Sequence, residues 1–214
     1  MSDYVWVSNM QDDPSLTRFM STDLPEPSVE EAKEALRVRW SGKPAPPNYC
    51  PKRIWAQEIH ESRQAMRPKY SPAPLFEAGG RWIMSSKAAG VFGSFDLGSG
   101  ALCPVHEGVW APDAKTRDPD EWFCWIFGNS KTAFSEAHSP LALGRDGPEL
   151  RDICNFPWEM ADDLIAVRAE AKEGPDVWVD RTLARSVFLS RQLGDALDAA
   201  GFREAFRLYR ARLI

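Results

Sequence analysis

The strongest constraint on the fold is a local pattern that occurs twice in this chain: a short apolar run, a serine, a helical stretch and a glycine. In the first copy, residues 81–105, the apolar run predicts a strand, and Ser85 or Ser86 is a natural helix N-cap. We expect the helix to reach about Phe95, and Gly98 to stop it before a second strand at 101–105. Gly90 and Gly93 inside this helix would indicate close packing against a neighbour.

In the second copy, Val187–Leu189 predicts a strand, Ser190 caps the next helix and Gly201 ends it. The apolar face of that helix comprises Leu193, Ala196, Leu197 and Ala200. Residues 202–212 fit a helix or a strand, and the parallel with the first copy favours a strand. The two copies predict an α+β fold, a mixed sheet with helices built around two similar strand–helix–strand units, and they indicate a weak internal duplication.

The N-terminal part of the chain is less regular. Residues 4–7 predict a short strand, and a capping box of Ser28 and Glu31 begins a helix that we expect to end near Gly42. Four prolines between Lys43 and Lys52 then forbid regular structure. We expect an ordered surface loop there, within one domain spanning 1–214. The alternative is a linker that leaves residues 1–50 as a loosely attached subregion.

The remaining segments complete the mixed pattern. Residues 52–66 are predicted to be helical, although their apolar stripe is ragged. The aromatic and β-branched run 121–127 predicts a central strand. Residues 165–171 and 177–179 predict a hairpin or two strands with a loop, whereas the rival interpretation makes 158–172 a helix. Strands and helices do not alternate regularly, which favours α+β over α/β.

Composition and charge exclude several classes of protein. The net charge of −5 is unfavourable for nucleic-acid binding, which depends on Lys and Arg neutralising phosphates. No apolar run is long enough to span a membrane, and the first residues do not resemble a secretory signal. The four cysteines are widely spaced, so we expect free thiols in a reducing cytoplasm.

No pattern in the sequence predicts catalysis, a cofactor or a metal. His60, His106 and His138 are isolated, and Gln64 replaces the second histidine that a zinc-protease helix would need after His60. A glycine-rich phosphate loop and a serine-nucleophile motif are also missing. We therefore expect no catalytic, cofactor-binding or metal-binding residues, and the protein is not expected to be an enzyme, although a sequence-distant dyad stays open.

The densest group of acidic residues lies in the segment APDAKTRDPDEW. It contains Asp113, Asp118, Asp120 and Glu121 and ends at Trp122. One interpretation is a polar turn, in which aspartate and proline have their ordinary roles. The other is a docking loop whose carboxylates attract a basic partner and whose tryptophan anchors it.

The two copies also resemble the bacterial immunity protein family eleven of polymorphic toxin systems. The first copy matches in its serine, short helix and aromatic-Asp-Leu-Gly sequence. The second matches in Trp178, Asp180, Phe188, Ser190, Leu193, Ala196, Leu197, Ala200 and Gly201. The resemblance covers about residues 74–210 and implies a cytoplasmic protein that binds and neutralises a cognate toxin, which would often be basic if it attacks nucleic acid. The alternatives are an enzyme of unrecognised type and a structural or scaffold subunit.

Overall fold

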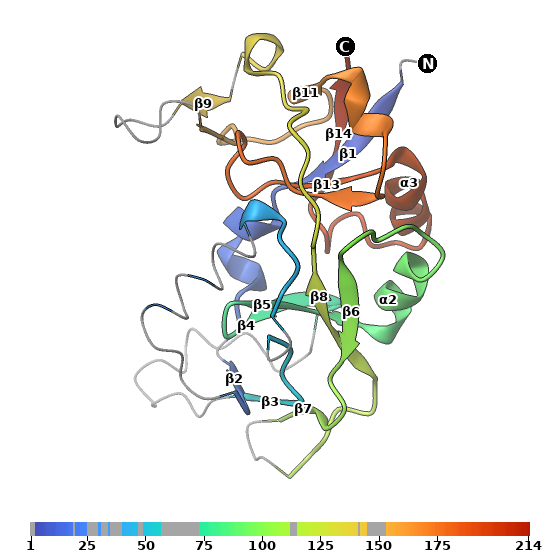
Figure 1. The fold of residues 1–214 in the computed structure, drawn as a ribbon. Coiled ribbons are helices and arrows are strands. Elements are labelled where there is room, and N and C mark those ends of the chain that lie inside the picture. Colours follow the sequence, from blue (N-terminus) through green and yellow to red (C-terminus); the bar gives the residue numbers. More distant parts are fainter. Residues whose placement is uncertain are drawn as a thin grey trace.

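The computed structural model describes residues 3–18, 20–24, 30, 34, 40–46, 49–56, 73–111, 115–140, 142–144 and 153–214. Among these residues the strands form two large sheets, which we call sheet A and sheet B (Figure 1). Sheet A has the order β11-β14-β1-β13-β12, and sheet B has the order β4-β5-β8-β6. Mixed strands and helices make this an α+β fold.

The elements have the following bounds. Sheet A contains β1 (Tyr4–Ser8), β11 (Ala166–Val167), β12 (Val177–Trp178), β13 (Val187–Leu189) and β14 (Leu208–Leu213). Sheet B contains β4 (Leu75–Ala78), β5 (Arg81–Ser85), β6 (Ala101–Pro104) and β8 (Trp122–Ile126). Smaller sheets join β2 (Met20–Thr22), β3 (Arg53–Ala56) and β7 (Gly108–Trp110), and β9 (Leu143–Gly144) with β10 (Cys154–Asn155). The helices are α2 (Ser86–Phe92) and α3 (Arg191–Ala199), with 3-10 turns η1 (Met10–Asp12), η2 (Pro14–Leu16), η4 (Glu136–His138) and η5 (Ala169–Lys172).

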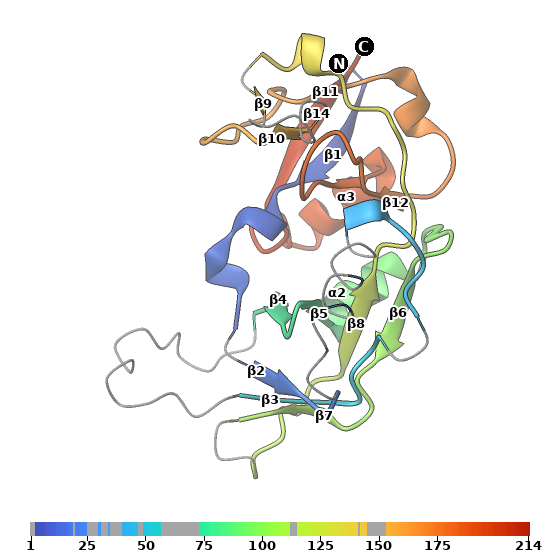
Figure 2. The ribbon, with the colours of Figure 1, turned by 60° about the vertical axis from the view of Figure 1, so that its left-hand side comes forward.

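The two large sheets have similar connections. In sheet B the chain runs β5, α2, β6, and β8 lies antiparallel between the two strands. In sheet A it runs β13, α3, β14, and β1 takes the place between them. Helices α2 and α3 pack against each other on the same side of the molecule (Figures 1 and 2). A duplication of the two sequences stays a prediction.

The predicted helix caps are confirmed. The hydroxyl of Ser85 accepts a hydrogen bond from the backbone N–H of Ala88, and that of Ser190 accepts one from Leu193. Helix α2 is shorter than predicted because it ends at Phe92, and Gly98 takes its left-handed conformation (φ +55) in the turn that follows. A Cβ at Gly90 would meet nothing within 4 Å, so this glycine does not mark close packing.

Both large sheets are buried on two faces, because successive side chains along each strand enter different cores. In β1, Tyr4 and Trp6 face the cluster that lies between the sheets, whereas Val5 and Val7 face a second cluster beyond sheet A. In sheet B, Trp125 faces the shared cluster, and its neighbours along β8 face a third cluster toward β3 and β7. The shared cluster therefore unites the two sheets.

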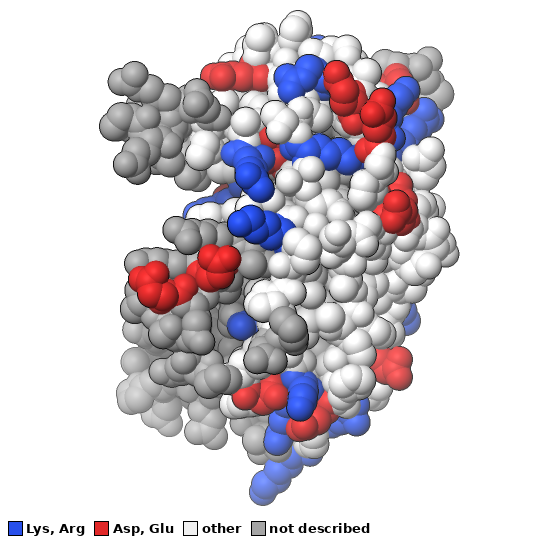
Figure 3. Space-filling model, viewed as in Figure 1, with Lys and Arg blue, Asp and Glu red and all other residues white. Residues whose placement is uncertain are grey.

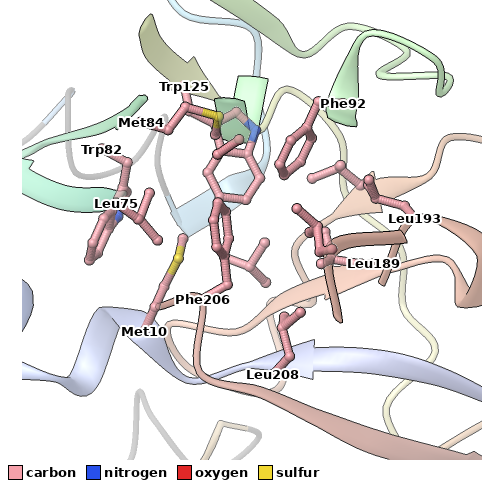
Figure 4. Packing of buried hydrophobic residues seen from close by; sticks show 14 of the residues in the cluster. Met10, Leu75, Trp82, Met84, Phe92, Trp125, Leu189, Leu193, Phe206 and Leu208 are labelled. Carbon is pink, nitrogen blue, oxygen red and sulfur yellow. The ribbon is translucent and has the colours of Figure 1, made fainter. Parts of the chain in front are cut away.

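Aromatic rings fill the centre of the shared cluster, together with leucine and methionine side chains (Figure 4). The ring of Trp125 packs edge-on against Phe92 of α2, with centroids 4.9 Å apart. The same indole lies 5.9 Å from the ring of Phe206, which precedes β14. Residues from α2, from β8 and from the C-terminal segment are thus buried together, and such aromatic contacts add about 0.5–1.5 kcal/mol each to the burial term.

Several predictions are wrong. Residues 53–56 form strand β3 rather than a helix, because pairing with β2 and β7 buries Ile54 completely; residues 57–66 lie outside the described part. Segment 158–172 is not one helix. Of the two alternatives for 165–171 and 177–179, the hairpin is wrong, since β11 pairs with β14 and β12 with β13, whereas two strands joined by a loop is confirmed. Near the start of the chain β1 is the middle strand of sheet A, and the single domain over 1–214 stays a prediction.

Two other predictions concern the helix expected from Ser28 and the strand expected near the C-terminus. Of the helix expected from Ser28, the structure describes Glu30, Glu34, Trp40 and Ser41, all helical, and the cap itself lies outside the described residues. The strand predicted near the C-terminus is confirmed as β14. No helix among the described residues is long and apolar enough to cross a membrane.

Candidate functional site

The predicted docking loop is only partly a surface. Asp118 is half-buried, and its carboxylate accepts hydrogen bonds from the backbone N–H of Asp120 (2.9 Å) and from the indole Nε1 of Trp122 (3.1 Å). Asp118 therefore braces the turn. Asp120 and Glu121 are exposed, and Asp113 lies outside the described residues.

Trp122 cannot serve as an exposed anchor, because its side chain belongs to a core. It is 2% exposed and packs edge-on against Phe76, with ring centroids 5.3 Å apart. The alternation along β8 is the cause, since Trp122, Cys124 and Ile126 all point to the cluster beyond sheet B. Trp122 is therefore not part of the exposed surface. The exposed carboxylates of this loop, Asp120 and Glu121, have no exposed aromatic side chain among the described residues 115–122.

A different tryptophan is exposed. Trp158 lies in the segment between β10 and β11 and is 93% exposed, the highest value among the large hydrophobic residues of the described chain. The residues before it are anchored, because Phe156 and Pro157 are buried. The exposed Glu159 follows directly. The indole is therefore presented to solvent from a fixed base rather than from a free end.

The second half of this segment is held by the C-terminal strand. The carboxylate of Asp162 accepts two hydrogen bonds from the guanidinium of Arg203 (2.8 and 2.9 Å) and one from the backbone N–H of Arg210 (2.9 Å). Desolvation opposes ionisation of Asp162, but these donors outweigh it and lower its pKa below the usual range. The backbone N–H of Asp163 also bonds to the carbonyl of Arg210 at 2.8 Å.

We call three of the exposed residues of this segment, Trp158, Glu159 and Asp163, the Trp158 surface. It has the composition that the sequence predicted for residues 113–122, an indole flanked by carboxylates, in another place. In the sequence, Pro157 directly before Trp158 favours a turn there, whereas the rival interpretation of 158–172 as a helix does not.

The motif residues of the second copy build the scaffold instead of a site. The rings of Trp178 and Phe188 stack with centroids 5.5 Å apart. The buried carboxylate of Asp180 accepts hydrogen bonds from the backbone N–H groups of Ala133 and Phe134, and from both donors of Thr182. Because its carboxylate accepts hydrogen bonds from four protein donors, Asp180 links two loops and serves the structure.

The cysteine and histidine side chains do not form an activated centre. Hydrogen bonding to Cys124 and burial raise the pKa of the Cys50 thiol, and burial raises that of Cys103 to about 12. Such thiols stay protonated at neutral pH and are weak nucleophiles. His106 is exposed, His138 shares a hydrogen bond with the hydroxyl of Ser135, and His60 lies outside the described residues. In the part of the chain that the structure describes, no group of three or more potential ligands could hold a metal.

Comparison with known proteins gives no assignment. No family model matches the chain, and no curated protein matches it in sequence.

Proposed function

We propose that this chain is an immunity-type protein, which binds and neutralises a cognate bacterial toxin domain in the cytoplasm. The resemblance of its two copies to immunity protein family eleven suggests the class, and the exposure of Trp158 is the observation that carries the proposal. An indole that is 93% exposed, on a segment fixed by its buried neighbours, contributes a large binding free energy when a partner covers it. The free thiols of the four cysteines agree with a reducing compartment.

Burial of one tryptophan removes roughly 150–250 Å² from water, and interface tryptophans commonly contribute about 2 kcal/mol or more. The base of the Trp158 surface is already ordered by Phe156, Pro157 and Asp162. Binding would therefore cost little additional conformational entropy, which favours affinity.

The charges on this surface favour a basic partner. Glu159 directly follows Trp158, Asp163 lies five residues beyond Trp158 in the same segment, and the whole chain carries a net charge of −5. Such charges mainly raise the association rate and its dependence on salt, whereas a buried aromatic contact mainly slows dissociation. The protonated thiols and the fully bonded Asp180 favour binding over catalysis as the activity of this chain.

The test begins with the tagged full chain and its Trp158→Ala variant, used side by side to capture partners from the cells that produce it. A protein retained by the wild type and lost by the variant is then expressed in a bacterial host, alone and together with each form of the chain. We expect the partner to arrest growth, the wild-type chain to restore it, and Trp158→Ala to restore it poorly.

The double variant Asp120→Lys/Glu121→Lys is the comparison for the surface predicted from the sequence. If this variant loses the rescue while Trp158→Ala keeps it, the function stands and the binding surface is the 118–121 turn. If the partner is harmless, or the wild-type chain does not restore growth, the immunity function is wrong.

A further inference from the structure

A cavity of about 370 Å³ opens between residues 40–43 and the loop 180–186, which follows β12. Its apolar wall is formed by Trp40, Ile153, Leu183 and Ala184. The volume lies at the lower end of the range for small-ligand pockets, about 300–1,000 Å³. Figure 3 shows Lys and Arg side chains beside the indentation at mid-height on the left of the molecule, where this loop and residues 40–43 face each other in Figure 1.

Cationic side chains border this apolar wall. Lys43 and Arg181 are exposed, and neither has a carboxylate partner among the described residues. Arg181 makes one hydrogen bond, at 3.3 Å, to the carbonyl of Ser41, so most of its donors are free. Arg185 also lines the cavity and is paired with Asp12 at 2.8 Å. An anion entering the cavity would therefore meet two cations that no carboxylate of the described residues neutralises.

The acidic residue in the lining does not oppose this charge strongly. Asp180 is 2% exposed, and its carboxylate already accepts four hydrogen bonds from the protein. These bonds hold the loop 180–186 in place, so this side of the cavity is formed before a ligand binds.

Two local features of the lining also suit a ligand. The hydroxyl of Ser41 is buried and has no hydrogen-bond partner, which is costly unless something binds there. The backbone of Arg185 is in the left-handed region, at φ +58, where a side chain other than glycine is strained. Strain of this kind is concentrated at functional sites.

We propose that this cavity binds a small organic anion, with an oxyanion head between Lys43 and Arg181 and an apolar body against Trp40 and Leu183. A guanidinium with free donors suits a carboxylate or a phosphate, since both accept paired hydrogen bonds. This site is independent of the Trp158 surface.

The experiment measures binding of four simple probes to the full chain by titration calorimetry and ligand-observed NMR. Benzoate and phenyl phosphate carry the two candidate heads on the same ring, benzyl alcohol is the neutral counterpart, and benzylammonium is the cationic one. We expect saturable binding of at least one anion and much weaker binding of the neutral and cationic probes. The tighter anion identifies the head group.

The variant Lys43→Gln/Arg181→Gln should weaken binding of that anion roughly tenfold or more, because both side chains would contact its head. The control Lys52→Gln/Lys87→Gln removes two exposed lysines elsewhere and changes the net charge equally. A thermal melt of each variant establishes that it is folded. Three results would overturn the proposal: no saturable binding of either anion at millimolar concentration, equal binding of benzyl alcohol, or equal weakening by the control variant.

Discussion

Gly194 offers the sharpest test of the packing between α3 and sheet A. Glycine inside a helix ordinarily destabilises it by about 1 kcal/mol relative to alanine, so Gly194→Ala should be stabilising on propensity alone. In the structure, however, a Cβ at Gly194 would lie 1.9 Å from Cδ1 of Trp6, whose side chain is fully buried. The indole Nε1 also donates a hydrogen bond to the carboxylate of Asp195 at 3.0 Å, and a shift of the ring would weaken that bond.

Overpacking of this kind costs about 1–3 kcal/mol, and sometimes more. Because the gap must grow by more than 1 Å to reach ordinary contact, we expect the overpacking to cancel the propensity gain and to leave Gly194→Ala up to about 2 kcal/mol less stable than the wild type. Gly90→Ala in α2 is the matched control. A Cβ there meets nothing within 4 Å, so it should gain about 0.5–1 kcal/mol. Urea denaturation followed by circular dichroism measures both. A Gly194→Ala variant as stable as Gly90→Ala would refute the contact with Trp6.

Three further predictions concern the core, the charges and the metal content. Leu197→Ala should lower the free energy of unfolding by about 2–5 kcal/mol, because Leu197 is fully buried in the shared cluster; an unchanged thermal melt would contradict its placement. Since the pKa of Asp162 is lowered in the folded state, its contribution is present above the unfolded pKa of about 3.9 and lost as the pH falls through the folded value. Asp162→Asn should therefore destabilise the chain at pH 7, and its effect should shrink as the pH falls below about 3.9; an effect that does not change with pH would show that ionisation of Asp162 is not responsible. Elemental analysis of purified protein should find no stoichiometric transition metal, and about one zinc per chain would overturn that expectation.

The local signals in the sequence predicted the elements that depend on neighbours along the chain. Ser85 and Ser190 cap helices because a serine hydroxyl reaches the backbone N–H three residues ahead, which needs no tertiary contact. The strand over β8 followed from its aromatic and β-branched residues. Strand β3 could not be predicted in this way, because it exists through pairing with β2 and β7, from distant parts of the chain.

The burial of Trp122 could not be predicted for a related reason. Composition identified an acidic segment that ends in a tryptophan, but the side on which Trp122 points is decided by the alternation of β8 between two cores. Trp158 is exposed because Phe156 and Asp162 fix the segment on either side of it. Neither outcome is visible in composition, since both depend on which neighbouring residues find a buried partner.

The most direct measurement of the central claim is the rate at which the purified partner domain dissociates from Trp158→Ala. Loss of an interface tryptophan that contributes about 2 kcal/mol or more should speed dissociation about 30-fold or more, with a smaller change in association. Trp40→Ala removes another exposed indole, 42% accessible and distant in sequence, and should leave the rate nearly unchanged. A dissociation rate for Trp158→Ala equal to that of the wild type would contradict the proposal that the partner binds this surface.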